Sequence, residues 1–298
     1  MKLRKKSPSR IVFEVINTLI MLCIAAICLI PIVHVIMSSF SNPLALASSR
    51  GLVLWPRQFS LIGYEKVMQA KTVWNGYAHT LFYVVTQAVA GVILTAIAAY
   101  VLSRKNLMLR NGLMFMITFT MMFSGGLVPY YVLFSKIGML NTVWAVILPG
   151  MITPMNIIIM RTFFLTIPYS LEESAKLDGA GAWKILLQIY LPLSKASLAV
   201  IALFLVVAQW NSYFIPMIFL QDRELRPLQL VLKDLITTSQ GAAILGAQGG
   251  GGSTAEAALL TKVINYAVIV VGTLPIFCIY PFVQKYFVTG VMIGSIKG

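Results

Sequence analysis

The sequence predicts an all-α integral membrane protein with six transmembrane helices. Of its 298 residues, 59% are hydrophobic and only 11% are charged, whereas a soluble domain has about 25% charged residues. The apolar residues gather in six runs of about 20 residues or more, which is the length a helix needs to cross roughly 30 Å of hydrocarbon. These runs lack the two-residue alternation of lipid-facing strands, so helices are favoured over a barrel.

The six runs define a transmembrane domain over residues 11–290. The expected spans are 11–40, 77–102, 113–134, 143–164, 196–219 and 263–287. Three hydrophilic segments between them are longer than a simple turn, at 41–76, 168–195 and 221–262. Because the number of spans is even, the basic tail 1–10 and the C-terminal tail 288–298 are expected on one side of the membrane.

The distribution of positive charge predicts which side that is. With both termini inside, fourteen of the 23 Lys and Arg residues lie in inner segments, and the other nine lie in outer segments beside five acidic residues. Positively charged loops stay in the cytoplasm. Both termini and the segment 168–195 are therefore expected to be cytoplasmic, and the segment 221–262 external.

The composition excludes several classes of function. The net charge of +14 would suggest nucleic acid on a soluble surface, but here the charges lie between apolar runs, so no nucleic-acid partner is expected. Cys23, Cys28 and Cys278 all lie inside apolar runs without short spacing, which predicts neither a disulfide framework nor a metal site. No carboxylate pair or nucleophile set appears, and we expect no enzyme activity in this chain.

The cytoplasmic segment 168–195 carries the most specific signal. It is expected to form a helix, a glycine turn at Gly179 and Gly181, and a second short helix that Pro192 separates from the next span. Such a hairpin could lie on the membrane interface or simply link two spans. However, its first half carries three acids, which anionic headgroups would repel, and small residues that allow close approach of another backbone. Docking into a protein partner is the better interpretation.

This segment resembles the EAA loop of permeases in binding-protein-dependent ABC importers. The pattern of that loop is Glu-Ala-Ala, three residues, Gly, nine residues, Ile, one residue and Leu-Pro. The matching positions are Glu173, Ala175, Gly179, Ile189, Leu191 and Pro192, with Ser174 in place of the first Ala.

The resemblance covers most of residues 75–298. Residues 75–77 (Asn-Gly-Tyr), 99–104 (Ala-Tyr-Val-Leu-Ser-Arg), 123–129 (Phe-Ser-Gly-Gly-Leu-Val-Pro) and 291–298 are similar to carbohydrate-uptake permeases of the maltose-permease G-subunit type. Within that type, the Phe-Ser-Gly-Gly segment at 123–126 and the ending at 291–298 look most like the LplC-like subgroup, which imports oligosaccharides. A sugar or oligosaccharide is therefore the implied substrate.

The resemblance also implies partners and a mechanism. The EAA segment would form a coupling helix in a cleft of a cytosolic ATPase, with Glu173 pairing with a basic or hydrogen-bonding group there. The residues implied in this contact are Glu172, Glu173, Ser174, Ala175, Asp178, Gly179, Ile189, Leu191 and Pro192. The chain is expected in the inner membrane, and its implied partners are a second homologous permease, two copies of the cytosolic ATPase and an extracytoplasmic solute-binding protein. The chain has no G-x-x-x-x-G-K-[ST] phosphate loop, so ATP and Mg²⁺ are expected on the ATPase and no cofactor on this chain.

Polar residues inside the spans are candidates for lining the substrate path. They are Gln87, Asn156, Gln209, Trp210, Asn211 and Tyr213. Hydrogen bonding between helices is the alternative for each of them. In the external segment, Gly241, Gly249, Gly250, Gly251 and Gly252 are expected either in a loop that reaches into the binding protein or in a plain linker.

The main alternative function is an ion-coupled secondary transporter or a channel. Such a protein usually shows carboxylates within its spans or an internal repeat, and neither is visible. Pro149 and Pro154 flank Gly150 in the fourth span and predict that the helix bends or is interrupted there, which fits either a moving helix or a static kink.

Overall fold

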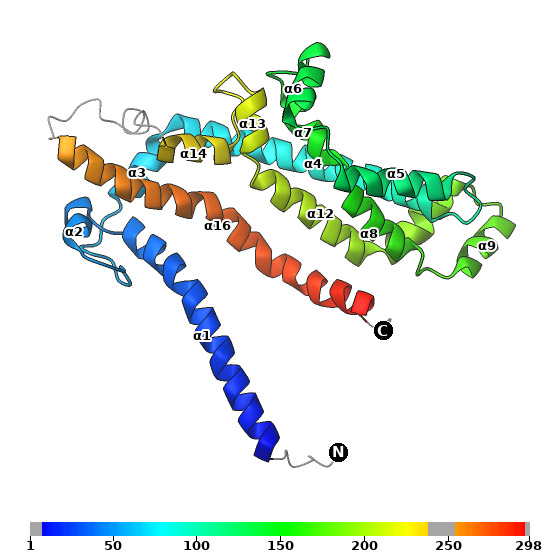
Figure 1. The fold of residues 1–298 in the computed structure, drawn as a ribbon, viewed down its shortest axis with the longest axis horizontal. Coiled ribbons are helices and arrows are strands. Elements are labelled where there is room, and N and C mark those ends of the chain that lie inside the picture. Colours follow the sequence, from blue (N-terminus) through cyan, green and yellow to red (C-terminus); the bar gives the residue numbers. More distant parts are fainter. Residues whose placement is uncertain (1–7, 238–253, 296–298) are drawn as a thin grey trace. The chain divides into compact units, whose positions relative to one another are not determined.

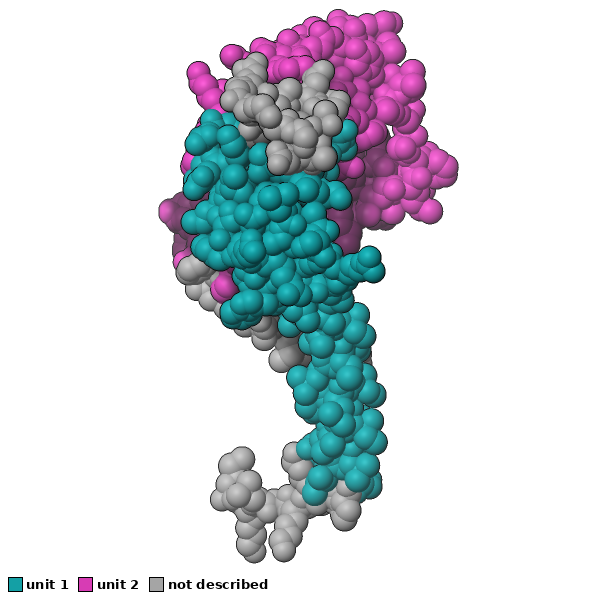
Figure 2. Space-filling model, turned by 90° about the vertical axis from the view of Figure 1, so that its left-hand side faces the viewer, with its two compact units in different colours: residues 1–70, 234–273 teal, residues 71–233, 274–298 magenta. Residues whose placement is uncertain are grey.

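The computed structural model describes residues 8–237 and 254–295 (Figure 1). In these ranges the secondary structure is helical, apart from one isolated β-bridge between Ser41 and Phe59. The chain divides into two compact units, one made of residues 1–70 and 234–273 and the other of residues 71–233 and 274–298 (Figure 2). The helices are α1 (Pro8–Ser39), α2 (Pro43–Ser48), α3 (Ile62–Gln69), α4 (Lys71–Ser103), α5 (Arg110–Met122), α6 (Leu127–Lys136), α7 (Val143–Met151), α8 (Pro154–Phe164), α9 (Tyr169–Leu177), α10 (Ala182–Ile185), the π-helical turn η1 (Leu186–Tyr190), α11 (Leu191–Leu193), α12 (Lys195–Trp210), α13 (Phe214–Phe219), α14 (Leu228–Thr237) and α16 (Thr254–Ser295).

The described helices contain four to six candidate membrane spans, which confirms an all-helical membrane fold. Four segments are long and apolar enough by themselves: Ser9–Ser39, Lys71–Ser103, Val143–Phe164 and Ala258–Cys278. Two further spans arise if each of two sharply bent helix pairs counts as one, α5 with α6 and Ala182–Leu193 with α12.

The expected span 113–134 is not one continuous helix. α5 ends at Met122, and α6 begins at Leu127 after a bend of 112°. Gly126 between them has a φ of 83°, a left-handed conformation that an L residue adopts only at a cost. The expected span therefore breaks at Ser124-Gly125-Gly126, where glycine permits a conformation that other residues avoid.

The expected span 196–219 is also interrupted. α12 ends at Trp210, and α13 starts a new helix at Phe214. Pro216 has no N–H and clashes with a preceding helical turn, so α12 cannot pass through it, whereas a proline fits in the first turn of α13. The expected external segment 221–262 likewise contains α14, and α16 begins at Thr254, before the expected start at residue 263.

In the first unit, polar contacts tie the segment after α1 to the rest of the unit. The Val53 N–H donates to His34 Nδ1 over 2.9 Å, and the hydroxyls of Ser39 and Tyr64 lie 2.7 Å apart. In α3, Gly63 faces Val263 and Ala267 of α16 so closely that an added Cβ would lie 3.1 Å from the Val263 side chain. His34 is therefore a structural histidine in this unit.

In the second unit, α4 is the central helix and packs against α7, α8 and α12 (Figure 1). Gly91 makes this packing close, because an added Cβ would lie 2.6 Å from the Met151 carbonyl oxygen and 2.8 Å from Leu205 Cδ1. α7 and α8 are separated by Ile152 and Thr153, beside the predicted Pro149 and Pro154 bend. The cluster of buried side chains around Tyr100, Phe164, Tyr190 and Ile201 joins α4, α8, η1 and α12.

Candidate functional site

The site is built on α9, whose last turn is closed by hydrogen bonds that require a glycine. The N–H of Ala180 donates to the Ala175 carbonyl over 2.8 Å, and the N–H of Gly179 donates to the Lys176 carbonyl over 3.0 Å. This pair of bonds is a Schellman motif, in which the residue after the cap takes a left-handed conformation. Gly179 has a φ of 76°. The glycine of the EAA-like pattern thus ends the helix.

The second half of the segment turns back into the protein. Ile189 and Leu191 pack against the buried cluster around Tyr100, and Pro192 lies in α11. An 84° bend then separates this part from α12. Pro192 therefore lies at the expected boundary with the next helix, and Ile189 and Leu191 hold the segment against the bundle.

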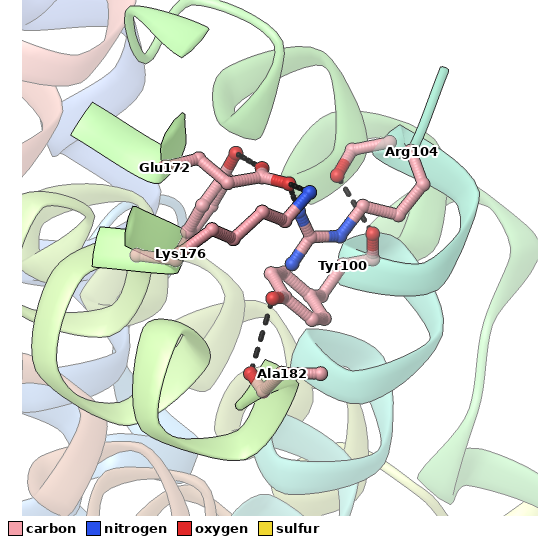
Figure 3. Close-up of polar contacts among 7 residues, drawn as sticks. Tyr100, Arg104, Glu172, Lys176 and Ala182 are labelled. Carbon is pink, nitrogen blue, oxygen red and sulfur yellow. Dashed lines mark hydrogen bonds and ion pairs between the residues drawn. The ribbon is translucent and has the colours of Figure 1, made fainter. Parts of the chain in front are cut away.

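The inward face of α9 carries a buried acid, Glu172, which is only 2% exposed (Figure 3). Its carboxylate forms ion pairs with Arg104, at the end of α4, and with Lys176, one turn along α9 at 2.7 Å. The Tyr190 hydroxyl donates to Glu172 Oε2 over 2.9 Å. Three partners on three elements thus compensate the burial of one charge, which is the condition for keeping it ionised.

Electrostatics keep this carboxylate charged. Burial raises the pKa of Glu172, but hydrogen bonds from Lys176 and Tyr190 and the charge of Arg104 outweigh burial, and the net pKa lies below the usual value. The hydrogen bond to Glu172 in turn raises the pKa of Lys176. At neutral pH the network is therefore a carboxylate held by two cations.

Arg104 and Tyr100 connect this network to α4. The Arg104 guanidinium lies 3.8 Å from the centroid of the Tyr100 ring and 5.6 Å from that of Tyr190. The Tyr100 hydroxyl donates to the Ala182 carbonyl over 3.0 Å (Figure 3). Sequence reasoning gave no role to Arg104, Tyr100 or Tyr190. The only sequence signal for them was the segment 99–104, which resembles the carbohydrate-uptake permeases. Nothing in the sequence indicates that this segment contacts Glu172.

The outward face of α9 has a different character. Glu173, Ser174 and Asp178 are exposed, and Leu177 is 89% exposed. In α10, Trp183 is 64% exposed. Large apolar side chains beside exposed acids are typical of a protein contact surface. We call Glu173, Ser174, Leu177, Asp178 and Trp183 the docking face. Leu177 and Trp183 were missed from the sequence, because only the small and acidic residues of the segment were considered as contacts for a partner.

A cavity of about 650 Å³ lies behind α9, between the end of α4, the α8–α9 connection and Tyr190. Its wall includes Arg104, Lys105, Lys176 and the single acid Glu172. Among residues 8–237 and 254–295, no group of three or more His, Cys, Asp or Glu residues could hold a metal ion.

The six path candidates fall into two groups. Gln87, Asn156, Gln209 and Trp210 are buried inside the chain, whereas Asn211 and Tyr213 are exposed in the break between α12 and α13. Gln87 packs against Gly150, and its Oε1 has no hydrogen-bond partner in the described part of the chain. A path between two subunits would be lined by residues exposed on each subunit, so Asn211 and Tyr213 have the suitable location. The role in substrate passage stays a prediction for all six, and Gly241 and Gly249–Gly252 lie outside the described residues.

Comparison with known proteins places this geometry in a family. Residues 91–293 match the family model described as "Binding-protein-dependent transport system inner membrane component". The chain is 38% identical over 278 residues to the polygalacturonan/rhamnogalacturonan transport system permease protein YtcP of Bacillus subtilis, covering 93% of this chain and 96% of that protein. It is 37% identical over 287 residues to the protein LplC of the same organism, covering 96% and 95% of the two chains.

One solved structure is also similar along almost the whole chain. A chain in the crystal structure of a bacterial ABC transporter involved in the import of the acidic polysaccharide alginate superposes with a TM-score of 0.84 at 31% identity, covering 96% of this chain and all of that chain. The family match spans more than half of the sequence, and these relatives cover nearly all of it. The chain belongs to the family of inner membrane components of binding-protein-dependent transport systems, the permease subunits of ABC importers.

Proposed function

We propose that α9 is the coupling helix of this permease and that its docking face binds a cytosolic ATPase subunit. One observation carries the proposal: α9 is fixed from within by the buried Glu172 network, while Glu173 and Leu177 on its other side are exposed and make no side-chain hydrogen bond or ion pair with the described residues. A helix anchored on one face and presenting acid and apolar groups on the other is suited to transmit a partner's motion.

The assembly follows from the family. Two ATPase copies would bind ATP and Mg²⁺ and hydrolyse ATP, while this chain and a second homologous permease would form the path, each contributing half. In the proposed topology both termini and α9 are cytoplasmic, as the excess of inner Lys and Arg indicates. An external solute-binding protein would deliver substrate to the opposite face, near the segment 221–262.

The substrate class comes from the relatives. The names of two of them concern polygalacturonan with rhamnogalacturonan and the acidic polysaccharide alginate. We propose an oligosaccharide as the substrate, with acidic oligosaccharides as the first candidates. Uptake of a radiolabelled oligogalacturonate by proteoliposomes, in competition with unlabelled neutral maltooligosaccharide, separates the acidic class from the neutral one.

Co-purification tests the docking face. The chain is expressed with its second permease and ATPase and captured by a tag. The variant Glu173→Lys with Leu177→Asp is expected to retain the second permease and lose the ATPase, because it puts a positive charge in place of the acid and a charge in place of the apolar side chain. Glu65→Lys, an exposed charge reversal on α3, serves as the matched control and should retain both. Retention of the ATPase by the docking-face variant at the wild-type level would exclude α9 as its binding site.

A further inference from the structure

The second unit holds α4 by polar contacts at both of its ends, and the two ends adjoin segments that lie on opposite sides of the membrane in the proposed topology. One end contacts α9, and the other contacts the start of the external segment after α13. α4 runs through the unit between these two regions (Figure 1).

At the α9 end, three separate contacts hold α4. Arg104 pairs with Glu172 of α9, and the Tyr100 hydroxyl donates to the carbonyl of Ala182 in α10. Arg161 of α8 donates from Nε to the Leu102 carbonyl over 2.9 Å. These contacts join α4 to segments with no direct chain connection to it, since α9 is continuous only with α8 and α10. A displacement of α9 is therefore passed to α4 through side chains.

At the opposite end, α4 holds the external segment. The Tyr83 hydroxyl donates to the Leu225 carbonyl over 2.7 Å, and the Leu228 N–H donates to Thr80 Oγ1 over the same distance. Tyr83 and Thr80 are both buried. Gly76 lies so close to Leu228 that an added Cβ would be 3.1 Å from its Cα. The bond between Leu228 and Thr80 is buried, so breaking it leaves an unsatisfied N–H group, and the bond between Tyr83 and Leu225 is partly buried.

Between these ends α4 is one unbroken helix of 33 residues. From Thr80 to its last residue, Ser103, it spans ~35 Å at 1.5 Å per residue. It contains no proline, and it is clasped at its middle where Gly91 meets Met151 and Leu205. Hinges in helices arise at prolines, glycine pairs or bulges. α7 and α8 are separated at Ile152–Thr153 and α12 ends at Trp210, so α4 is the stiff connection in this unit.

We infer that α4 is a strut that couples the ATPase-facing helix α9 to the external segment 221–233, with Arg104, Glu172, Thr80 and Tyr83 as its positioning residues. The inference rests on the proposed docking of the ATPase to α9. Its consequence is that occupancy of the external face by the loaded binding protein alters ATP hydrolysis through α4, and that neither end needs to contact substrate.

The test is a double-mutant cycle in the complete transporter reconstituted with its binding protein. Glu172→Gln removes the charge that holds Arg104 and keeps the shape, and Tyr83→Phe removes only the hydroxyl that holds Leu225. Tyr83→Phe is expected to leave ATPase co-purification and basal ATP hydrolysis at the wild-type level, and stimulation in every variant is expressed relative to that variant's own basal rate. Each should lower stimulation of hydrolysis by the loaded binding protein at least fivefold. Tyr131→Phe is the matched control, since the structure gives the Tyr131 hydroxyl no hydrogen bond in the described residues.

The double variant separates a strut from two local defects. The effects of substitutions at distant residues usually add as free energies. If both residues act on the same connection, however, a second substitution has no further effect once the first has broken that connection. The double variant should therefore show the stimulation of a single variant. Losses that multiply, or unchanged stimulation in Tyr83→Phe, would overturn the strut. If Glu172→Gln fails to assemble, Arg104→Met replaces it in the cycle.

A further variant distinguishes failure of the proposed ATPase docking from failure of the proposed role of α4. Glu173→Gln is the same substitution at the neighbouring, exposed position and should weaken ATPase co-purification. If it and the docking-face variant both bind ATPase normally while the cycle remains non-additive, α4 couples the external segment to some other input.

Discussion

Gly91→Ala is the sharpest test of how α4 is packed. The new methyl group would lie 2.6 Å from the Met151 carbonyl oxygen and 2.8 Å from Leu205 Cδ1. The carbonyl belongs to the backbone of α7, so it cannot rotate away as a side-chain tip would. Relief requires that α7 and α4 move apart, which loosens contacts along both helices.

The magnitude follows from two opposed terms. Overpacking a close helix contact costs about 1–3 kcal/mol, whereas replacing glycine by alanine inside a helix gains up to about 1 kcal/mol. Gly112→Ala is the matched control, because Gly112 lies in α5 and an added Cβ there meets nothing within 4 Å. The helix-propensity gain is common to both variants. Their difference of about 1–3 kcal/mol therefore isolates the steric cost.

Thermal unfolding in detergent, followed by intrinsic tryptophan fluorescence, measures this difference. At about 2–4 °C per kcal/mol for a chain of this size class, Gly91→Ala should unfold roughly 2–12 °C below Gly112→Ala. Scan rates must match, because membrane proteins often unfold irreversibly. If Gly91→Ala unfolds at or above the temperature of Gly112→Ala, the close contact of α4 with α7 does not exist as described.

Three further outcomes are expected. Gly179→Ala should speed amide hydrogen exchange in the last turn of α9, because alanine at a φ of 76° is strained, while Gly181→Ala, which has an ordinary φ of −72°, should not. Because the pKa of Glu172 is lowered, the contribution of its carboxylate to stability is complete above about pH 5 and is lost as pH falls through the native pKa. The protection of α9 amides from hydrogen exchange, corrected for intrinsic exchange rates, should therefore be constant from pH 8 to 5 and fall below about pH 4. Asn211→Ala with Tyr213→Ala should raise the half-saturating concentration for uptake at least fivefold without lowering the unfolding temperature, and an unchanged concentration would remove these exposed residues from the path.

The helical spans could be predicted from the sequence because hydrophobic runs directly reflect the thickness of the bilayer. The breaks within the spans were harder to predict, since they depend on the backbone conformation of single residues, which the average composition of a segment does not reveal. The interruption of the helix between Pro149 and Pro154 was predicted because proline acts locally. The 112° bend between α5 and α6 has an equally local cause in Ser124-Gly125-Gly126, but a hydropathy window counts glycine as neutral and passes over it.

The site was predicted in part. The spacing of Glu173, Gly179 and Pro192 located the segment, and Gly179 has the left-handed conformation that a helix end requires. The network around Glu172 could not be predicted from one sequence, because Arg104 is 68 residues away from Glu172 along the chain. Only the packing of α4 against α8 and η1 brings Arg104 and Glu172 together. That tertiary contact cannot be inferred from a single sequence without an alignment of relatives.

The two adjacent glutamates of α9 show why the site divides as it does. Consecutive residues in an α-helix point about 100° apart, so the carboxylates of a Glu-Glu pair cannot both point directly into the bundle, and in α9 Glu172 is buried while Glu173 is exposed. The inward one needs cations, and Arg104 and Lys176 supply them. Removing one partner of a buried ion pair typically costs about 3–5 kcal/mol, while an exposed carboxylate contributes little to folding. Loss of Glu172 should therefore weaken the attachment of α9 to α4, and loss of Glu173 should weaken only what α9 binds.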